Sequence, residues 1–180
     1  SFAGKGGPVS LILPADSAWN PGGVIADAAD VPAKSLASED TIEVAANALK
    51  SASKPLILIN GTALLPEGLK EAAKLEAAGI RTMTDTFVWR QTRGAGQFSP
   101  AKMQYFSEGA MADLEGHDLM ILVGTQTPAA FFAYPEKPSL LVPEGCEVIS
   151  LGGAEIDSAA ALKSLVGALE LKDAKPALDR

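Results

Sequence analysis

Short apolar runs alternate with amphipathic stretches between residues 41 and 172, and this alternation dominates the pattern of the chain. The runs at 56–59 and 119–123 are apolar throughout, which is typical of strands buried on both faces. Weaker runs at 80–84 and 147–151 predict two further strands. Strands of this kind need covering layers on both sides, so the stretches between them must supply helices.

Helical spacing appears in those stretches. Apolar residues recur at i, i+3, i+4 and i+7 over 42–49, which predicts a helix with Asp40 as its N-cap. Pro66 and Gly79 suit the first turn and the end of a second helix, and Asp157 suits the N-cap of a last one. The pattern predicts an α/β fold, a Rossmann-like open parallel sheet with helices on both faces in a three-layer sandwich.

Residues before 41 follow a different pattern. An apolar run at 8–13 lies between two prolines and predicts a strand, whereas 16–40 has no periodicity and contains Pro, Gly and Asp throughout. A structureless loop of that length is unusual within one domain, so we interpret it as a linker between domains. Residues 1–15 would then be the last strand of a mostly absent neighbour, 41–172 the main domain and 173–180 the start of another linker. The start at Ser1 rather than Met fits a piece of something longer.

Composition narrows the class of protein. Hydrophobic residues make up 47% and charged residues 21% of 180 residues, which excludes a disordered chain. Lys and Arg number 15 against 22 Asp and Glu, and the net charge of −7 argues against a nucleic-acid partner. No apolar run is long enough for a membrane span. One cysteine allows no internal disulfide or cysteine zinc cluster and fits a cytoplasmic location.

The ends of the two strongest strands carry the candidate chemistry. Both runs continue directly into Gly-Thr, and ligands of open parallel sheets bind beyond the carboxyl ends of the strands. Glycine there lets a phosphate approach backbone N–H groups, so the pattern suggests a nucleotide crevice. The alternative is ordinary turn chemistry after buried strands. The candidate crevice residues are Asn60, Gly61, Thr62, Asp85, Thr86, Gly124, Thr125 and Gln126.

Signs of catalysis are weak. Gly94-Ala95-Gly96 matches only half of a dinucleotide fingerprint. The sole histidine, His117, precedes the 119–123 run, so we expect it at the surface on the opposite, amino end of the sheet. Cys146 opens a strand, and no carboxylates or histidines show metal-ligand spacing. The sequence therefore predicts no catalytic and no metal-binding residue in this chain, and it argues against a sirtuin-type deacylase, which needs four cysteines and a histidine in the crevice.

An aromatic cluster falls in a stretch without periodicity. The segment 131–135 reads Phe-Phe-Ala-Tyr-Pro. Aromatic residues in such a stretch either anchor an interface or bury a long loop against its own domain, and the sequence leaves both open.

Several segments resemble thiamine-diphosphate-dependent enzymes. The run 7–16 (GPVSLILPAD) resembles the last strand of their N-terminal, pyrimidine-binding domain, and 54–75 resembles the opening of their central domain. Three segments resemble the acetolactate synthase large-subunit-like branch of this family: 85–96, 103–114 and, most specifically, 131–148 (FFAYPEKPSLLVPEGCEV).

The resemblance implies a non-catalytic central domain that bridges the N- and C-terminal cofactor-binding domains of a homo-oligomeric parent enzyme. In the family, the catalytic Glu lies in the N-terminal domain and a Gly-Asp-Gly motif for Mg²⁺ and thiamine diphosphate in the C-terminal domain; no Gly-Asp-Gly occurs here. The parent reaction would be decarboxylation of a 2-oxo acid with acyl transfer. Some relatives hold FAD or ADP in the central domain, where an Arg-Phe-Asp run follows the second strand; here Gln126-Thr127-Pro128 follows instead.

Overall fold

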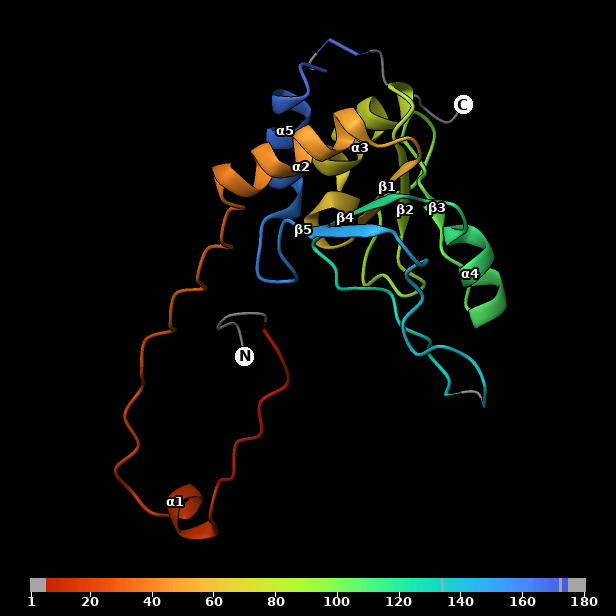
Figure 1. Ribbon diagram of the computed structural model, residues 1–180. Coiled ribbons are helices and arrows are strands. Elements are labelled where there is room, and N and C mark those ends of the chain that lie inside the picture. Colours follow the sequence, from red (N-terminus) through yellow and green to blue (C-terminus); the bar gives the residue numbers. More distant parts are fainter. Residues whose placement is uncertain (1–5, 134, 172, 175–180) are drawn as a thin grey trace.

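Five parallel strands form an open sheet in the order β3-β2-β1-β4-β5, which confirms the expected fold class (Figure 1). The computed structural model describes residues 6–133, 135–171 and 173–174. The strands are β1 (Pro55–Ile59), β2 (Arg81–Thr84), β3 (Ala101–Lys102), β4 (Leu119–Val123) and β5 (Glu147–Ser150). The helices are α1 (Ala15–Trp19), α2 (Glu39–Ser51), the 3₁₀ helix η1 (Gly61–Leu64), α3 (Pro66–Ala77), α4 (Ser107–Leu114) and α5 (Ser158–Ala168).

The two strongest apolar runs become the centre of the sheet. β1 and β4 pair along their whole length, from Pro55 opposite Leu119 to Ile59 opposite Val123. All five β4 residues are buried, as a strand covered on both faces requires. The predicted bounds of this strand, 119–123, are confirmed.

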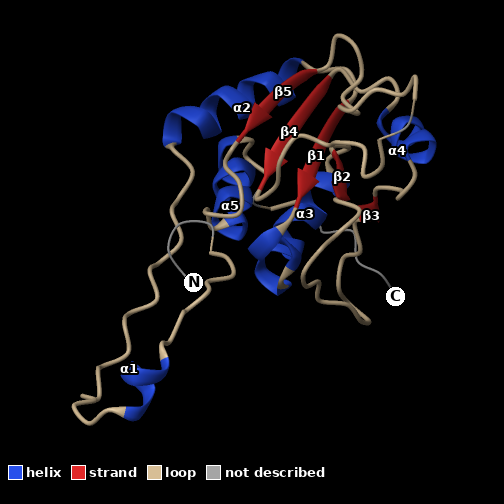
Figure 2. Ribbon diagram, turned by 90° about the horizontal axis from the view of Figure 1, so that it is seen from below, coloured by secondary structure: helices blue, strands red, loops and turns tan. Residues whose placement is uncertain are grey.

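Three helices cover one face of the sheet and one helix covers the other (Figure 2). Ile57 and Ile121 point to the face packed by α2, α3 and α5. Leu58 and Met120 point to the opposite face, packed by α4 and by Leu141 from the long β4–β5 connection. Crossovers between parallel strands are right-handed. The connecting helices therefore lie on opposite faces of the sheet on either side of the point where the strand order reverses. That reversal lies between β1 and β4, where parallel sheets open a crevice.

The helix starts agree with the sequence for α3, which begins at Pro66, and for α5, and they differ for α2. Asp157 caps α5, its Oδ1 accepting hydrogen bonds from the N–H groups of Ala159 (3.1 Å) and Ala160 (3.2 Å). The cap of α2 is Ser38 rather than Asp40, because the Ser38 hydroxyl accepts from the Thr41 N–H at 3.2 Å. In the described parts of the chain no helix combines the length and the apolarity needed to cross a bilayer.

Residues 6–34 form an arm that extends away from the sheet in both ribbon views (Figures 1 and 2). Among the described residues the segment 8–13 pairs with no strand, and Leu11 and Ile12 are each 87% exposed. Its assignment as a strand of a neighbouring domain stays a prediction. The composition of 8–13 suits a buried strand, but no strand of the described residues lies beside this segment. The predicted linker contains the short helix α1.

The root of the arm is fixed to the domain by a backbone clamp. The Ser35 N–H donates to the Glu155 carbonyl at 3.1 Å, and the Asp157 N–H donates to the Ser35 carbonyl at 2.8 Å. Beside it, the Lys34 ammonium donates to the Ala154 carbonyl at 2.6 Å. The arm is therefore tied to the loop that leads into α5.

Candidate functional site

A pocket of about 370 Å³ lies at the carboxyl ends of the strands, at the switch point between β1 and β4. We call it the crevice pocket. It is of the size that small-molecule sites have. Six of the eight predicted crevice residues line it: Asn60, Asp85, Thr86, Gly124, Thr125 and Gln126.

Among the described residues, Asp85 is the only acid or base of the Asp, Glu, Lys, Arg and His types that lines the crevice pocket. It follows β2, and its Oδ2 accepts hydrogen bonds from the Asn60 amide nitrogen at 2.7 Å and from the Thr125 hydroxyl. Burial raises the pKa of the Asp85 carboxyl, because desolvation disfavours the charged form, and the hydrogen bonds from Thr125 and Asn60 oppose that rise. The three side chains thus join the ends of β2, β1 and β4.

Gly61 and Thr62, also predicted for the crevice, lie outside the pocket lining. They form the start of η1, which turns the chain toward α5. The Thr62 hydroxyl donates to the Asp157 carboxylate at 2.8 Å, and the Gly61 N–H donates to the Asn60 side-chain oxygen at 2.8 Å. Thr62 therefore stabilises the junction of η1 with α5, and Gly61 closes the turn that leads from β1 into η1.

Packing also explains the second glycine, Gly124. Its φ is +72°, and a Cβ there would lie 2.6 Å from the Asn60 carbonyl oxygen and 2.8 Å from the Ser158 Cβ. Its N–H donates to the Gly152 carbonyl at 2.9 Å. The backbone N–H groups of both predicted phosphate glycines, Gly61 and Gly124, are thus already paired within the protein, so neither is free for a phosphate.

Ser158 holds this junction together from the first turn of α5. Its side chain is fully buried. The hydroxyl donates to the Asn60 carbonyl at 2.7 Å and accepts from the Ala63 N–H at 2.8 Å. The Asn60 carbonyl just after β1 and the Ala63 N–H in η1 are satisfied in this way, which fixes the wall of the crevice next to Asn60.

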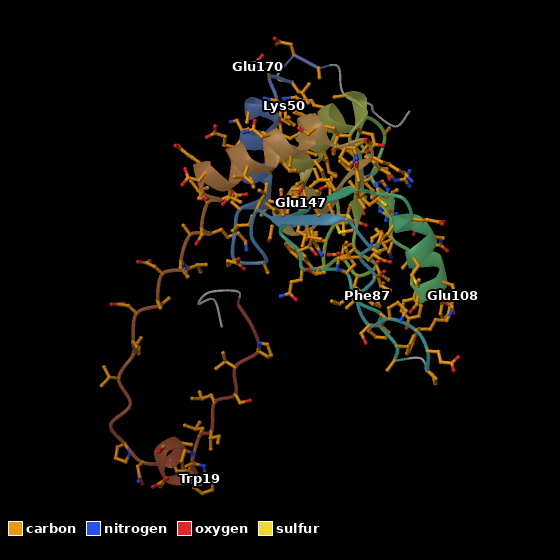
Figure 3. All side chains as sticks on the ribbon, viewed as in Figure 1. Trp19, Lys50, Phe87, Glu108, Glu147 and Glu170 are labelled. Carbon is orange, nitrogen blue, oxygen red and sulfur yellow. The ribbon has the colours of Figure 1, made fainter. Side chains whose placement is uncertain are left out.

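Aromatic rings form the other side of the crevice pocket. Phe87, Tyr105 and Phe131 all line it, with ring centroids 5.1 to 5.7 Å apart. Phe106 and Phe132 extend the cluster outward, each against Tyr105. Figure 3 shows Phe87 beside the β4–β5 connection, whereas Trp19 lies at the far end of the arm.

The aromatic residues of the 131–135 segment are neither fully buried against their own domain nor fully exposed as an interface anchor. Phe131 and Phe132 pack on rings of their own domain, yet remain 59% and 38% exposed. Tyr134 lies outside the described residues. The sequence did not identify Phe87 and Tyr105 as partners of this segment, because they come from irregular connections around β3 that carry no periodic pattern.

Comparison with known proteins identifies a relative of this chain by sequence. No protein-family model matches the chain. It is 42% identical over 156 residues to the acetolactate synthase large-subunit-like protein IlvX of Mycobacterium tuberculosis, a match that covers 85% of this chain and 30% of that one. This chain is related to the acetolactate synthase large-subunit-like proteins. The family resemblance seen in the sequence is confirmed.

Solved structures of two decarboxylases share the fold. Benzoylformate decarboxylase from Polynucleobacter necessarius matches with a TM-score of 0.57 and 17% identity, over 84% of this chain and 31% of that one. The thiamine diphosphate-dependent 4-hydroxybenzoylformate decarboxylase of Rhodococcus jostii matches with a TM-score of 0.50 and 19% identity, over 93% and 32% of the two chains. The chain thus spans about a third of the length of these acetolactate synthase-like and decarboxylase relatives.

The crevice pocket does not fit the cofactor of this family. Mg²⁺ and a diphosphate require clustered oxygen ligands and positive charge, but the described lining of the crevice pocket offers one carboxylate and no Lys, Arg or His. Elsewhere in the described part of the chain, no three His, Cys, Asp or Glu side chains lie close enough to hold a metal ion. No step of thiamine chemistry is therefore assigned to these residues.

His117 and Cys146 lie away from the crevice pocket. His117 is at the amino end of the sheet, as expected, but it is buried rather than at the surface, because its Nδ1 lies 2.9 Å from the Lys54 carbonyl oxygen. Burial lowers the pKa of His117, so the neutral ring donates to Lys54. Cys146 is partly buried, and burial, together with Asp118 and Glu147, raises the pKa of its thiol, which favours the unreactive protonated form.

Proposed function

We propose that this chain is the non-catalytic central domain of a thiamine-diphosphate- and Mg²⁺-dependent 2-oxo acid decarboxylase or carboligase of the acetolactate synthase type. Its role is to bridge the N- and C-terminal cofactor-binding domains of the same homo-oligomeric, cytoplasmic parent, a transferase or lyase. The observation that carries the proposal is the 42% identity to about a third of IlvX, combined with a fold shared by thiamine-diphosphate decarboxylases. The described residues supply a scaffold and no array of acid, base and nucleophile.

The arm supports a bridging role. Four of its large apolar side chains, Val9, Leu11, Ile12 and Leu13, are between 64% and 87% exposed within an extended segment. Exposed apolar residues in contiguous sequence mark a surface that is buried against another protein body. A neighbouring domain that offers a strand edge would satisfy both the side chains and the unpaired backbone of 8–13.

The experiment combines the chain with the flanking domains of its parent and measures complex formation by size-exclusion chromatography. We expect a complex that Ile12→Asp on the arm weakens and that Val44→Asp, at an exposed position of α2, leaves intact. Failure of the flanking domains to bind contradicts the bridging role. The chain alone, with thiamine diphosphate, Mg²⁺ and pyruvate, should show no turnover above buffer; turnover at an enzymatic rate overturns the proposal.

A second candidate function is an FAD- or ADP-binding module, favoured by the position of the crevice pocket at the switch point of the sheet. A nucleotide bound there would raise the melting temperature of the chain by mass action. No rise with millimolar FAD or ADP counts against this function. The absence of a cation from the pocket lining and the paired N–H groups of Gly61 and Gly124 favour the scaffold role over this one.

A further inference from the structure

One of the two carboxylate oxygens of Asp85, Oδ1, accepts no hydrogen bond from a described residue. Both of its hydrogen bonds, from Asn60 and Thr125, go to Oδ2, and no described residue donates to Oδ1. Since the same carboxyl lines the crevice pocket, its free oxygen is available to a ligand there. Because Asp85 is only partly buried, this oxygen stays accessible from the pocket and can accept a hydrogen bond from a bound donor.

The charge of the pocket excludes anions. In the lining that the described residues form, Asp85 is the only ionisable acid or base apart from the Tyr105 phenol, and no Lys, Arg or His there offsets its charge. Burial raises the pKa of the Asp85 carboxyl, which is the sign of a desolvated charge that lacks a counter-ion. A cation in the pocket would remove that penalty, whereas a phosphate or carboxylate would increase it.

The aromatic side of the pocket suits the same kind of ligand. The rings of Phe87, Tyr105 and Phe131 contact one another and form one wall, with exposed fractions of 58%, 39% and 59%. Ring faces attract cations within about 6 Å and bury the apolar body of a ligand. The remaining lining is uncharged and includes the amides of Gln104 and Gln126.

We propose that the crevice pocket binds a small organic amine in its ammonium form, with Asp85 as the counter-ion and the Phe87–Tyr105–Phe131 wall against its apolar body. Asp85 holds the charge, and the rings hold the carbon skeleton. The pocket thereby selects amines over carboxylates and phosphates of similar size. This specificity does not depend on the bridging role, because every residue that it uses belongs to the described part of this chain.

The test compares two probes of similar shape and opposite charge, phenethylamine and 3-phenylpropanoate, with the full chain. Methyl resonances of ¹³C-labelled methionine report the site: Met103 lines the crevice pocket, and Met111 lines a separate groove beside α4. We expect phenethylamine to shift Met103 and not Met111. By calorimetry it should bind at least about tenfold more tightly than 3-phenylpropanoate.

Two pairs of variants separate charge from ring contact. Asp85→Asn should bring the affinities of the two probes to within about twofold of each other, while Asp40→Asn, at an exposed position of α2, should keep the discrimination. Phe87→Ala should weaken phenethylamine several-fold, while Trp89→Ala, at an exposed position outside the lining, should not.

Three results would overturn the proposal. One is the absence of a Met103 shift with millimolar phenethylamine. Another is an affinity for 3-phenylpropanoate or ADP equal to or above that for phenethylamine. The third is discrimination that survives Asp85→Asn in a variant whose circular dichroism matches that of the native chain. Failure of the chain to bind its flanking domains would refute the bridging role and leave this specificity standing.

Discussion

Ser158→Ala removes the hydroxyl that joins the end of β1 to the start of α5. In the native chain this hydroxyl serves the Asn60 carbonyl at 2.7 Å and the Ala63 N–H at 2.8 Å, in a place with no solvent exposure at Ser158. Alanine leaves both backbone groups buried without a partner, at a cost of about 1–3 kcal/mol each. Because the two groups share one environment and relax together, we expect a total loss of about 2–4 kcal/mol in the free energy of unfolding.

The matched control is Ser164→Ala, on the exposed face of the same helix. It makes the same chemical change without a buried partner and should alter stability by less than about 0.5 kcal/mol. Both variants are measured in the full chain by urea unfolding followed by circular dichroism, with equal m-values as the test that the same transition is observed. On heating, Ser158→Ala should lower Tm by roughly 5–15 °C.

A loss below about 1 kcal/mol at Ser158, or one no larger than that at Ser164, would refute this reasoning. It would mean that Asn60 and Ala63 find other partners, and that the wall of the crevice pocket does not depend on α5.

Three further results are expected. In urea unfolding, Gly124→Ala should lower the free energy of unfolding by at least about 1 kcal/mol more than Gly145→Ala does. Both residues have positive φ, which costs alanine about 1 kcal/mol of strain, but only Gly124 has backbone within 4 Å of the new Cβ. Equal losses of stability would contradict the packing argument. The NMR titration midpoint of His117, the only histidine, should lie below the ordinary 6.5, and stability should fall as the pH drops below 6.5, because the unfolded chain takes up the proton first; a midpoint at or above 6.5 contradicts its burial. The Asp118 carboxylate accepts from the N–H groups of Ser53 and Lys54, just before β1, so Asp118→Asn should lower Tm at neutral pH. The difference from the native chain should vanish as the pH falls through the lowered pKa of Asp118, whereas a pH-independent difference would show that those hydrogen bonds do not depend on the charge.

The fold was predictable where burial alone decides structure. The strand at 119–123 is apolar at every position because both of its faces are covered, and its bounds needed no tertiary information. The run at 8–13 has a similar composition, but pairing depends on a neighbour that the described chain does not provide, so the strand predicted there stays a prediction. β3 went unpredicted because two exposed residues carry no period.

The candidate site was predictable in position and not in detail. Asn60, Asp85 and Thr125 line the crevice pocket because parallel strands place their carboxyl ends at one edge, and their role toward a ligand stays a prediction. The direction of η1 was not encoded in any local pattern, so Thr62 was placed in the crevice although its hydroxyl faces α5. His117 shows the same limit, because chain position gave its end of the sheet but not the carbonyl that buries it.

The clamp at Ser35 determines where limited digestion of this chain will stop. Upstream of it, the extended backbone is open to a protease, whereas from Ser35 onward the chain is locked through Glu155 and Asp157 to the loop before α5. Brief trypsin or thermolysin treatment would therefore shorten the chain to a compact remnant beginning near the clamp and carrying Trp89 as its sole tryptophan. The intrinsic fluorescence of that remnant would then report only the connection that leads from β2 to β3.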